Sequence, residues 1–238
     1  RSLVGELCRV AYEAIRMFFT EHFPKLEDPV PAVIIAPQSF GSLLNVHLHL
    51  HTLISIGVFD RHGNFHPTPD LDFSPLEKIF QELTFKMMLK QEAVTEERVA
   101  LLQSWQHSGF HIDASRRVAQ GHRDELERLL QYFERPPVSL ERLSYFADGR
   151  VLYRGGKFHP GLGRDHQLVS GVEFLAMLVP HILLRYECSV RYYGAISTTI
   201  RRKFGWIKKR KIQAPQNVPV IEGEESEFVR VRKRNWAT

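Results

Sequence analysis

The chain has 238 residues, 43% of them hydrophobic and 25% charged, a balance that is typical of a globular protein. No apolar run reaches the roughly 20 residues that a membrane-spanning helix needs. Two cysteines, Cys8 and Cys188, exclude a disulfide framework and fit a reducing cytoplasm. The formal net charge of +5 is uneven, because residues 185–238 carry 13 Lys and Arg against 5 Asp and Glu. This asymmetry indicates a polyanionic partner, with a solvated basic tail as the alternative.

Hydrophobic periodicity and turn residues predict the elements of the first half of the chain. Ser74-Pro75-Leu76-Glu77 has the form of a capping box with proline at the first helical position, and this pattern opens a helix. Asp60-Arg-His-Gly63 is turn-like and predicts that a strand returns after it. In chain order we expect helix 3–23, strand 32–36, strand 43–59, strand 64–67, helix 74–90, helix 96–106 and strand 109–112.

The second half of the chain mixes separate helices with a hairpin. A helix is expected over residues 123–133, where Pro136-Pro137 prevents its continuation. Asp148-Gly149 predicts a hairpin between strands 143–147 and 150–154. Ser170-Gly-Val-Glu173 is a second capping box, and its helix ends near residue 179. Strand 191–195 follows, and the residues beyond 215 are polar and charged. This mixture predicts an α+β fold with a central antiparallel sheet and helices packed on it.

Three alternating histidines, His47, His49 and His51, make up the most informative motif. Successive side chains of a strand point to opposite faces, so the three imidazoles would share one face while Leu48 and Leu50 face the core. Neutral imidazoles on a rigid strand are good ligands for divalent metal ions. The alternative is a half-buried strand whose polar face carries imidazoles by chance.

Tyr132 lies in the last turn of the predicted helix 123–133. Arg128 precedes it by one turn and Glu125 by two, so the three residues share a face. A phenol fixed at a helix end could attack a phosphate beside a metal ion, and Arg128 could stabilise the charge. Glu125 could be a metal ligand or a solvated carboxylate. On position alone, a tyrosine there is more often a core or boundary residue.

The segment 185–211 interleaves cations with aromatic residues. Cations follow a phosphate backbone and aromatic rings stack on bases, so this pattern favours nucleic-acid binding. The alternative is a basic amphipathic surface whose aromatic residues belong to the core. The candidate phosphate-binding residues are Arg191, Arg201, Arg202 and Lys203.

Several separated segments together resemble the rolling-circle insertion-sequence transposases of the HUH nuclease type, where HUH denotes two histidines around a hydrophobic residue. The resemblance covers roughly residues 5 to 205, and its parts occur in the family's order. The segments are Gln38-Ser-Phe-Gly-Ser-Leu-Leu-Asn-Val-His-Leu-His-Leu-His-Thr-Leu53, Gly57-Val58-Phe59, Ser108-Gly-Phe110, Leu126-Glu-Arg-Leu-Leu-Gln-Tyr-Phe-Glu-Arg-Pro-Pro-Val-Ser-Leu-Glu-Arg-Leu143, Asp148-Gly-Arg-Val-Leu-Tyr153 and Val190-Arg-Tyr-Tyr-Gly194.

The resemblance implies an HUH-nuclease-like fold and a reaction. His49 and His51 match the metal-binding pair, whereas His47 occupies a position that varies in the family. Tyr132 matches the nucleophile. The family's reaction is cleavage of single-stranded DNA at element ends, which leaves a covalent 5′-phosphotyrosine and a free 3′-OH. Mg²⁺ or Mn²⁺ would polarise the scissile phosphate.

Three departures from the family pattern affect these expectations. Many relatives carry a second tyrosine four residues earlier, where this chain has Arg128, so it resembles the single-tyrosine branch. Relatives often have an acidic residue at the position of Ile56, so the third metal ligand is open among Gln38, Glu125 and Asp60. Such transposases usually begin with a cysteine-rich zinc-binding domain. Its absence here indicates either a fragment or DNA recognition without that module.

These expectations divide the chain into four regions. They are an N-terminal helix over 1–30, an HUH-type catalytic domain over 31–184, a basic aromatic DNA-contacting segment over 185–214 and a flexible tail over 215–238. We expect a transposase without a membrane partner, located in the cytoplasm with the nucleoid, and the sequence leaves its oligomeric state open. The rival hypotheses are an inactive DNA-binding transposase remnant and a metal-dependent hydrolase of the amidohydrolase type. The amidohydrolase fold needs strands and helices that alternate along the chain, and the elements predicted here do not alternate in this way.

Overall fold

The computed structural model describes residues 3–68, 71–105, 109–133, 135–183 and 187–208. Residues 1–207 form one compact unit and residues 208–238 a second. The described part of the second unit is Lys208, so the tail predicted over 215–238 lies outside the described residues, as do Arg185, Tyr186 and Lys209–Lys211. The four predicted region boundaries stay predictions.

Helices and antiparallel sheets together make up the fold, so the predicted α+β class is confirmed. The helices are α1 (Leu3–His22), α2 (Ser74–Lys90), α3 (Glu96–Gln103), α4 (Arg123–Phe133), α5 (Gly171–Leu178) and α6 (Thr198–Lys203). The strands are β1 (Ala32–Phe40), β2 (Val46–Ile54), β3 (Gly57–Phe59), β4 (Phe65–Pro67), β5 (Leu143–Tyr145), β6 (Arg150–His159), β7 (Arg164–Ser170) and β8 (Arg191–Gly194).

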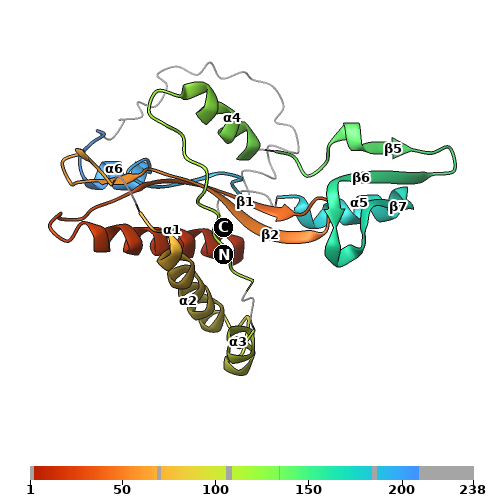
Figure 1. Cartoon of the computed structure of the whole chain (residues 1–238), viewed down its shortest axis with the longest axis horizontal. Coiled ribbons are helices and arrows are strands. Elements are labelled where there is room, and N and C mark those ends of the chain that lie inside the picture. The colour runs from red at the N-terminus through yellow and green to blue at the C-terminus, as the bar shows by residue number, and fades with distance from the viewer. Residues whose placement is uncertain (1–2, 69–70, 106–108, 134, 184–186, 209–238) are drawn as a thin grey trace, which may run out of the picture. The chain divides into compact units, whose positions relative to one another are not determined.

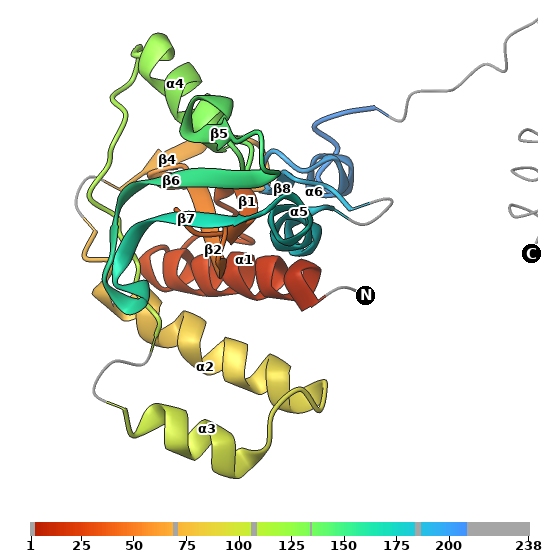
Figure 2. The same cartoon turned by 90° about the vertical axis from the view of Figure 1, so that its right-hand side faces the viewer.

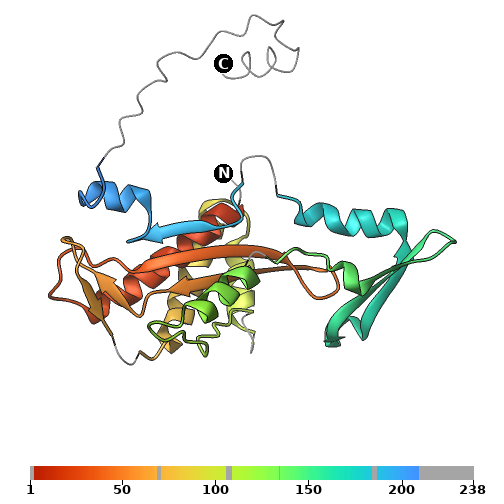
Figure 3. The same ribbon diagram turned by 90° about the horizontal axis from the view of Figure 1, so that it is seen from above.

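Three separate sheets organise these strands. The first has the order β2-β1-β8, and its strands lie side by side when seen from above (Figure 3). The second is the β3-β4 hairpin, and the third has the order β5-β6-β7. Every described strand pair is antiparallel, which removes support for the parallel barrel of the amidohydrolase hypothesis.

The first sheet has a helix on each side. Figures 1 and 2 show α1 on one side of the β1–β2 hairpin and α4 on the other. Alternate residues of β1, Val33 and Ile35, are fully buried against α1, while Ala36 and Gln38 are buried on the opposite face. The face that carries Ala36 and Gln38 is therefore the face that α4 covers.

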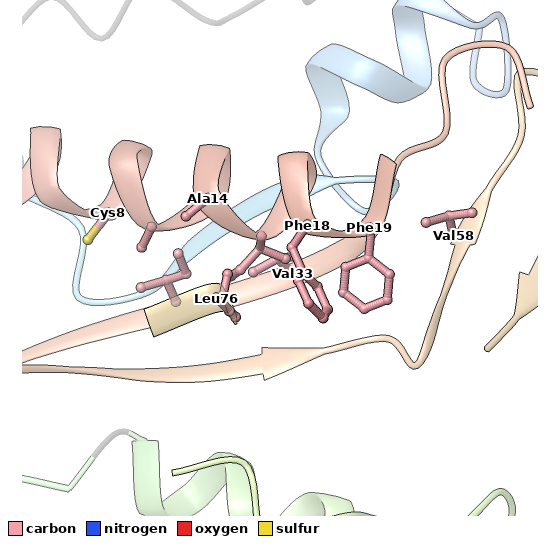
Figure 4. Close-up of a cluster of buried hydrophobic side chains, with 10 residues drawn as sticks. Cys8, Ala14, Phe18, Phe19, Val33, Val58 and Leu76 are labelled. Atoms are coloured by element: carbon pink, nitrogen blue, oxygen red, sulfur yellow. The ribbon is translucent and has the colours of Figure 1, made fainter. Parts of the chain in front are cut away.

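The main core lies between α1 and the sheet (Figure 4). The apolar stripe of α1 presents Phe18 and Phe19, which are 1% and 0% exposed, to Val33 and its neighbours. Each such aromatic side chain contributes about 1.5–3 kcal/mol by leaving water. Cys8 lies on the same stripe and is fully buried. The N-terminal helix is thus part of the main core and packs against one face of the first sheet.

The environment of Cys8 gives a chemical test of this packing. Burial raises the pKa of the Cys8 thiol to about 11, whereas Cys188 is exposed. Since the thiolate is the reactive form, Cys8 stays protonated and shielded at pH 8. We expect an aromatic disulfide reagent to react rapidly with one thiol per folded chain and with two in denaturant. Two rapid equivalents in the folded protein would contradict the packing of α1 against the sheet.

A second core attaches the β5–β6–β7 sheet to the first one. Leu44, in the turn between β1 and β2, is buried with Val151, Tyr153 and Phe174. The Gln167 side-chain amide donates a hydrogen bond of 2.6 Å to the Leu43 carbonyl. His181 Nε2 lies 3.0 Å from the Leu44 carbonyl oxygen. The tip of the β1–β2 hairpin is therefore held by the third sheet and by the segment after α5.

Most of the predicted elements are confirmed. The helices predicted over 74–90 and 123–133 match the bounds of α2 and α4. The Asp148-Gly149 hairpin joins β5 to β6, and the capping box at Ser170 forms with Glu173 as its partner. Strands 64–67 and 191–195 correspond to β4 and β8, and α1 matches helix 3–23. The helix predicted over 96–106 ends at Gln103, and Gln106 lies outside the described residues.

The long strand predicted over 43–59 is wrong, because the chain breaks between β2 and β3. Ser55 Oγ accepts a hydrogen bond from Ala32 N and donates one to the Gly57 carbonyl. Gly57 has φ 143°, and a Cβ there would lie 2.3 Å from the His66 carbonyl oxygen. Only glycine fits this close approach, so the turn is built into the sequence at Gly57.

Three further predictions are corrected. Ser74 does not cap α2, because Phe73 occupies the cap position and the Glu77 carboxylate accepts from Ile112 N instead. Residues 109–112 form no strand. The predicted strand 32–36 extends to Phe40 through Pro37, which is tolerated because β8 pairs with β1 only as far as Ile35. Two elements were not predicted as such, β7 and α6.

None of the described helices combines the length and the apolar character that crossing a bilayer requires.

Candidate active site on the β1–β2 hairpin

The three histidines of β2 form a continuous row on one face of the strand. The ring centroids of His47 and His49 are 5.2 Å apart, and those of His49 and His51 are 4.9 Å apart. The expected sharing of one face is therefore confirmed. Leu50 packs against the main core as expected, but Leu48 is 44% exposed, because the strand runs beyond the edge of that core.

Tyr132 lies against the end of this row. Its ring meets the His51 ring edge to face, with 5.1 Å between the centroids and an angle of 82° between the planes. The Tyr132 side chain is 46% exposed. The next residue, Phe133, is buried and its ring lies 5.6 Å from the His51 ring, so it anchors the end of α4 on the sheet. The fold thus brings together one of the two predicted metal ligands and the predicted nucleophile, which are far apart in sequence.

A buried glutamine connects the two elements. Gln38 pairs directly with His49 in the β1–β2 register, so its side chain shares the histidine face. Gln38 Oε1 is 3.2 Å from His51 Nε2, and Gln38 Nε2 donates a hydrogen bond of 3.2 Å to the Phe133 carbonyl. The Gln38 side chain therefore contacts both the histidine strand and the end of α4.

The surroundings of the row favour neutral imidazoles. Burial lowers the pKa of His51, and the neighbouring His49 lowers it further. Burial also lowers the pKa of His47, with additional contributions from His49 and from His159 of β6. A neutral imidazole has the free lone pair that a metal ion requires, so these shifts suit ligation.

The donor set can be tested against the needs of a divalent ion. Among the described residues, no group of three His, Cys, Asp or Glu side chains is placed to hold a metal ion. An amide oxygen is also a ligand for Mg²⁺, and two adjacent ligands in an octahedral shell lie about 3.0 Å apart. The 3.2 Å between Gln38 Oε1 and His51 Nε2 matches that separation. His49, whose Nδ1 lies 2.9 Å from the His47 carbonyl oxygen, keeps Nε2 for a ligand. The donor types of His49, His51 and Gln38 are ones that Mg²⁺ or Mn²⁺ accepts, and the geometry of the Gln38–His51 pair is compatible with a shared ion.

The other two candidates for the third ligand have different partners. Glu125 is exposed on α4, and its carboxylate is 3.6 Å from His122. Asp60 lies in the β3–β4 turn, where His66 and Asn64 hydrogen-bond its carboxylate and hold its pKa well below the usual range. These contacts favour Gln38 among the three. Arg128 is exposed on α4, one turn before Tyr132.

The predicted DNA-contacting residues divide into two groups. Arg201, Arg202 and Lys203 are exposed on α6, and Lys203 also lies 3.8 Å from Asp28 and over the Phe204 ring. Arg191 differs, because it lies on β8 with its Nε atom buried. The three α6 cations are open to solvent, whereas Arg191 is half-buried.

Comparison with known proteins places this chain in a family. The model of the Y2_Tnp family, described as "Putative transposase", matches residues 32–203, which run from β1 to α6. The chain belongs to the Y2_Tnp transposase family. The chain is also similar to the transposase for insertion sequence element IS801 of Pseudomonas savastanoi pv. phaseolicola, at 24% identity over 180 residues. That alignment covers 69% of this chain and 43% of the relative, so the chain spans less than half of the relative's length. No solved structure matches the chain.

The Y2_Tnp match includes every residue of the candidate site. His49, His51 and Tyr132 were identified through motif resemblance. The double contact of Gln38 was not foreseen, nor was the proximity of His159 to His47. A lone glutamine on a strand gives no sequence signal of a partner 95 residues away.

Proposed function

We propose that this chain nicks single-stranded DNA at element ends and transfers strands in rolling-circle transposition, with Tyr132 as the nucleophile and His49 and His51 as ligands of Mg²⁺ or Mn²⁺. The observation that carries the proposal is the 5.1 Å contact between the His51 and Tyr132 rings. A phenol held beside an imidazole that can bind a metal ion can act as the nucleophile of metal-assisted phosphoryl transfer.

Each residue has a defined part in the proposed reaction. The Tyr132 oxygen attacks the scissile phosphorus, the bond from phosphorus to the 3′ oxygen breaks, and the phenol proton leaves to solvent. The products are a 5′-phosphotyrosine and a DNA strand whose 3′ oxygen has taken up a proton. Arg128, one turn away on α4, stabilises negative charge near the phenol. The divalent ion, when bound, polarises the phosphate oxygens.

Tyr132 acts alone in this proposal. The residue one turn earlier on the same helix face is Arg128, so α4 offers no second phenol at that position. We therefore propose the single-tyrosine type of the HUH transposases, in which one residue both receives and returns the DNA strand. Attack of a 3′-OH from another DNA strand on the phosphotyrosine then joins the two strands and frees the Tyr132 phenol, whereas attack by the 3′-OH of the same nick would only reseal it.

A second candidate is a DNA-binding protein that has lost cleavage. It is favoured by one observation: among the described residues, no group of three His, Cys, Asp or Glu side chains is placed to hold a metal ion. Under this alternative, the chain binds single strands but forms no covalent adduct. The two candidates therefore differ in one measurable product.

The deciding experiment incubates the protein with single-stranded DNA from an element end and Mn²⁺. The expected result is a denaturant-resistant protein–DNA adduct whose peptide map places the nucleotide on the α4 peptide that contains Tyr132. Tight DNA binding without an adduct would instead establish the non-catalytic candidate. Hydrolysis of small amides without DNA cleavage would favour the hydrolase hypothesis.

The α6 cations give a separate prediction about DNA affinity. Changing Arg201, Arg202 and Lys203 to glutamine removes up to three phosphate contacts, each of which contributes about 0.7 to the slope of log affinity against log salt for single strands. We expect that slope to fall by about 2 in a fluorescence-anisotropy titration. The control makes the same charge change on α2 and α3, with Lys86, Lys90 and Arg98 replaced by glutamine, and should leave the slope unchanged. Equal slopes in the two variants would remove α6 from the DNA interface.

A further inference from the structure

We propose that Gln38 is a positioning residue that ties the Tyr132 helix to the metal-binding histidine, so that one side chain sets both the metal geometry and the place of the nucleophile. This inference rests on the proposed function and deepens it. Its observational basis is the pair of Gln38 contacts, to His51 Nε2 and to the Phe133 carbonyl.

The position of Gln38 leaves its amide few alternatives. The side chain belongs to a residue only 8% exposed, on the face of β1 that α4 covers. A buried amide that lost its hydrogen bonds would cost the protein about 1–3 kcal/mol per group. The observed pair of partners therefore fixes the orientation of the amide, with its nitrogen toward α4 and its oxygen toward β2.

The nitrogen of Gln38 fixes the end of the tyrosine helix. The last four carbonyls of a helix have no partner within the helix, and the Phe133 carbonyl is one of them. Gln38 supplies the missing donor at the residue directly after Tyr132. The backbone that carries the phenol is thereby attached to β1, whose register with β2 also places His49 and His51.

The oxygen of Gln38 links the same side chain to the metal ion. His51 Nε2 can either carry a hydrogen for Gln38 Oε1 or offer its lone pair to a cation, and it cannot do both. When a cation takes Nε2, the buried Oε1 loses its donor. The 3.2 Å separation of the two atoms allows the same cation to become the new partner of Oε1. Gln38 therefore keeps its hold on α4 in both states.

Two variants distinguish the role of the Gln38 amide N–H from the role of its oxygen. Gln38→Glu keeps an oxygen for the cation but loses the N–H that holds the Phe133 carbonyl. Gln38→Leu loses both groups at similar volume. Partners that orient a metal site typically change affinity or activity by about 10–100-fold.

The measurements are Mn²⁺ affinity by calorimetry without DNA, hydrogen exchange of the α4 amides, and the adduct rate at saturating Mn²⁺. Gln38→Glu should bind Mn²⁺ at least as tightly as the unmodified chain, exchange faster at the end of α4, and form adduct about tenfold or more slowly. Gln38→Leu should bind Mn²⁺ about tenfold or more weakly and exchange faster in α4 as well.

Gln167 provides the matched control. It is also a buried glutamine, 7% exposed, whose side-chain amide donates to a backbone carbonyl, that of Leu43. Gln167→Leu removes a comparable buried amide from the third sheet. We expect it to leave Mn²⁺ affinity and α4 exchange unchanged, although it lowers the overall stability.

The outcomes separate this inference from the proposed function. Unchanged Mn²⁺ affinity in Gln38→Leu would overturn the link to the metal, and unchanged α4 exchange in both Gln38 variants would overturn the link to the tyrosine helix. Equal effects of Gln167→Leu would reduce Gln38 to a general packing role. If the unmodified chain forms no adduct, the proposed function fails, yet the affinity and exchange measurements still decide the role of Gln38.

Discussion

Tyr132→Phe should lower the rate of covalent adduct formation with single-stranded DNA by at least roughly 1,000-fold, because the attacking oxygen is absent. Phenylalanine retains the ring that packs edge to face on His51, so α4 should keep its place on the sheet. The adduct is measured as a denaturant-resistant band with labelled DNA. DNA affinity, measured without Mn²⁺, should stay within about threefold of the starting value, since nearly all of the contact surface is unchanged.

Tyr145→Phe is the matched control for this change. Tyr145 ends β5 and is 70% exposed, so its phenol is accessible but lies on a different sheet from the histidine row. We expect a normal adduct rate in this variant. An adduct that forms equally well in Tyr132→Phe would assign the nucleophile to another residue.

The second large effect concerns the histidine pair. Exchanging both His49 and His51 for alanine should reduce Mn²⁺-dependent adduct formation by at least about 100-fold, because the two imidazoles are the proposed ligands of the metal ion. Chelation of the metal in the unmodified chain should give the same loss, and added Mn²⁺ should restore activity only when both histidines are present.

His47 allows a finer test within the same row. His47→Ala removes the exposed end of the row while the Gln38 and Tyr132 contacts of His51 stay in place. We expect less than about a threefold change in adduct rate, as for an exposed surface substitution. The double control His62→Ala with His111→Ala removes two exposed imidazoles elsewhere and should have no effect. Loss of activity in His47→Ala would show that the metal uses His47 as a ligand.

Acidification should weaken metal binding and stability together. Because burial holds the pKa of His51 below its usual value, the folded chain resists protonation that the unfolded chain accepts. The contribution of the neutral His51 ring to the free energy of unfolding is present above the ordinary histidine pKa and is lost as the pH falls below it. This direction agrees with the need of a metal ligand for a neutral ring.

The helices were the most predictable part of the fold, since their signals are local. Pro75 at the start of α2 and Pro136-Pro137 after α4 mark these helices directly in the sequence. The capping role of Ser74 failed for a tertiary reason, because Glu77 hydrogen-bonds Ile112 N, 35 residues away. A local pattern predicts the helix correctly but does not identify the distant groups with which its side chains form hydrogen bonds.

Strand limits and the site assembly depended on distant contacts. The break after Ile54 follows from the close approach of Gly57 to His66 across the β3–β4 hairpin. The strand β7 was not predicted because its sequence shows only a weak alternation of polar and apolar residues. Its pairing with β6 is the non-local contact that makes it a strand. The histidine face could be read from alternation alone. That Tyr132 belongs with the histidines could be inferred only from the family resemblance. The contacts of Gln38 with His51 and with the Phe133 carbonyl could be found only in the folded structure.

The contact between His51 and Tyr132 also sets an order of events during protein synthesis. Eighty-one residues separate the two side chains, and β8, which completes the first sheet, begins only at Arg191. At roughly 5–20 residues per second, the imidazoles are made about 4–16 s before the phenol. A nascent chain therefore carries the histidine row before it carries Tyr132, so under the proposed function it could not form the covalent adduct at that stage. The long sequence separation therefore means that the proposed site cannot assemble while only the histidine strand has been made, and the first sheet is complete only once β8 follows.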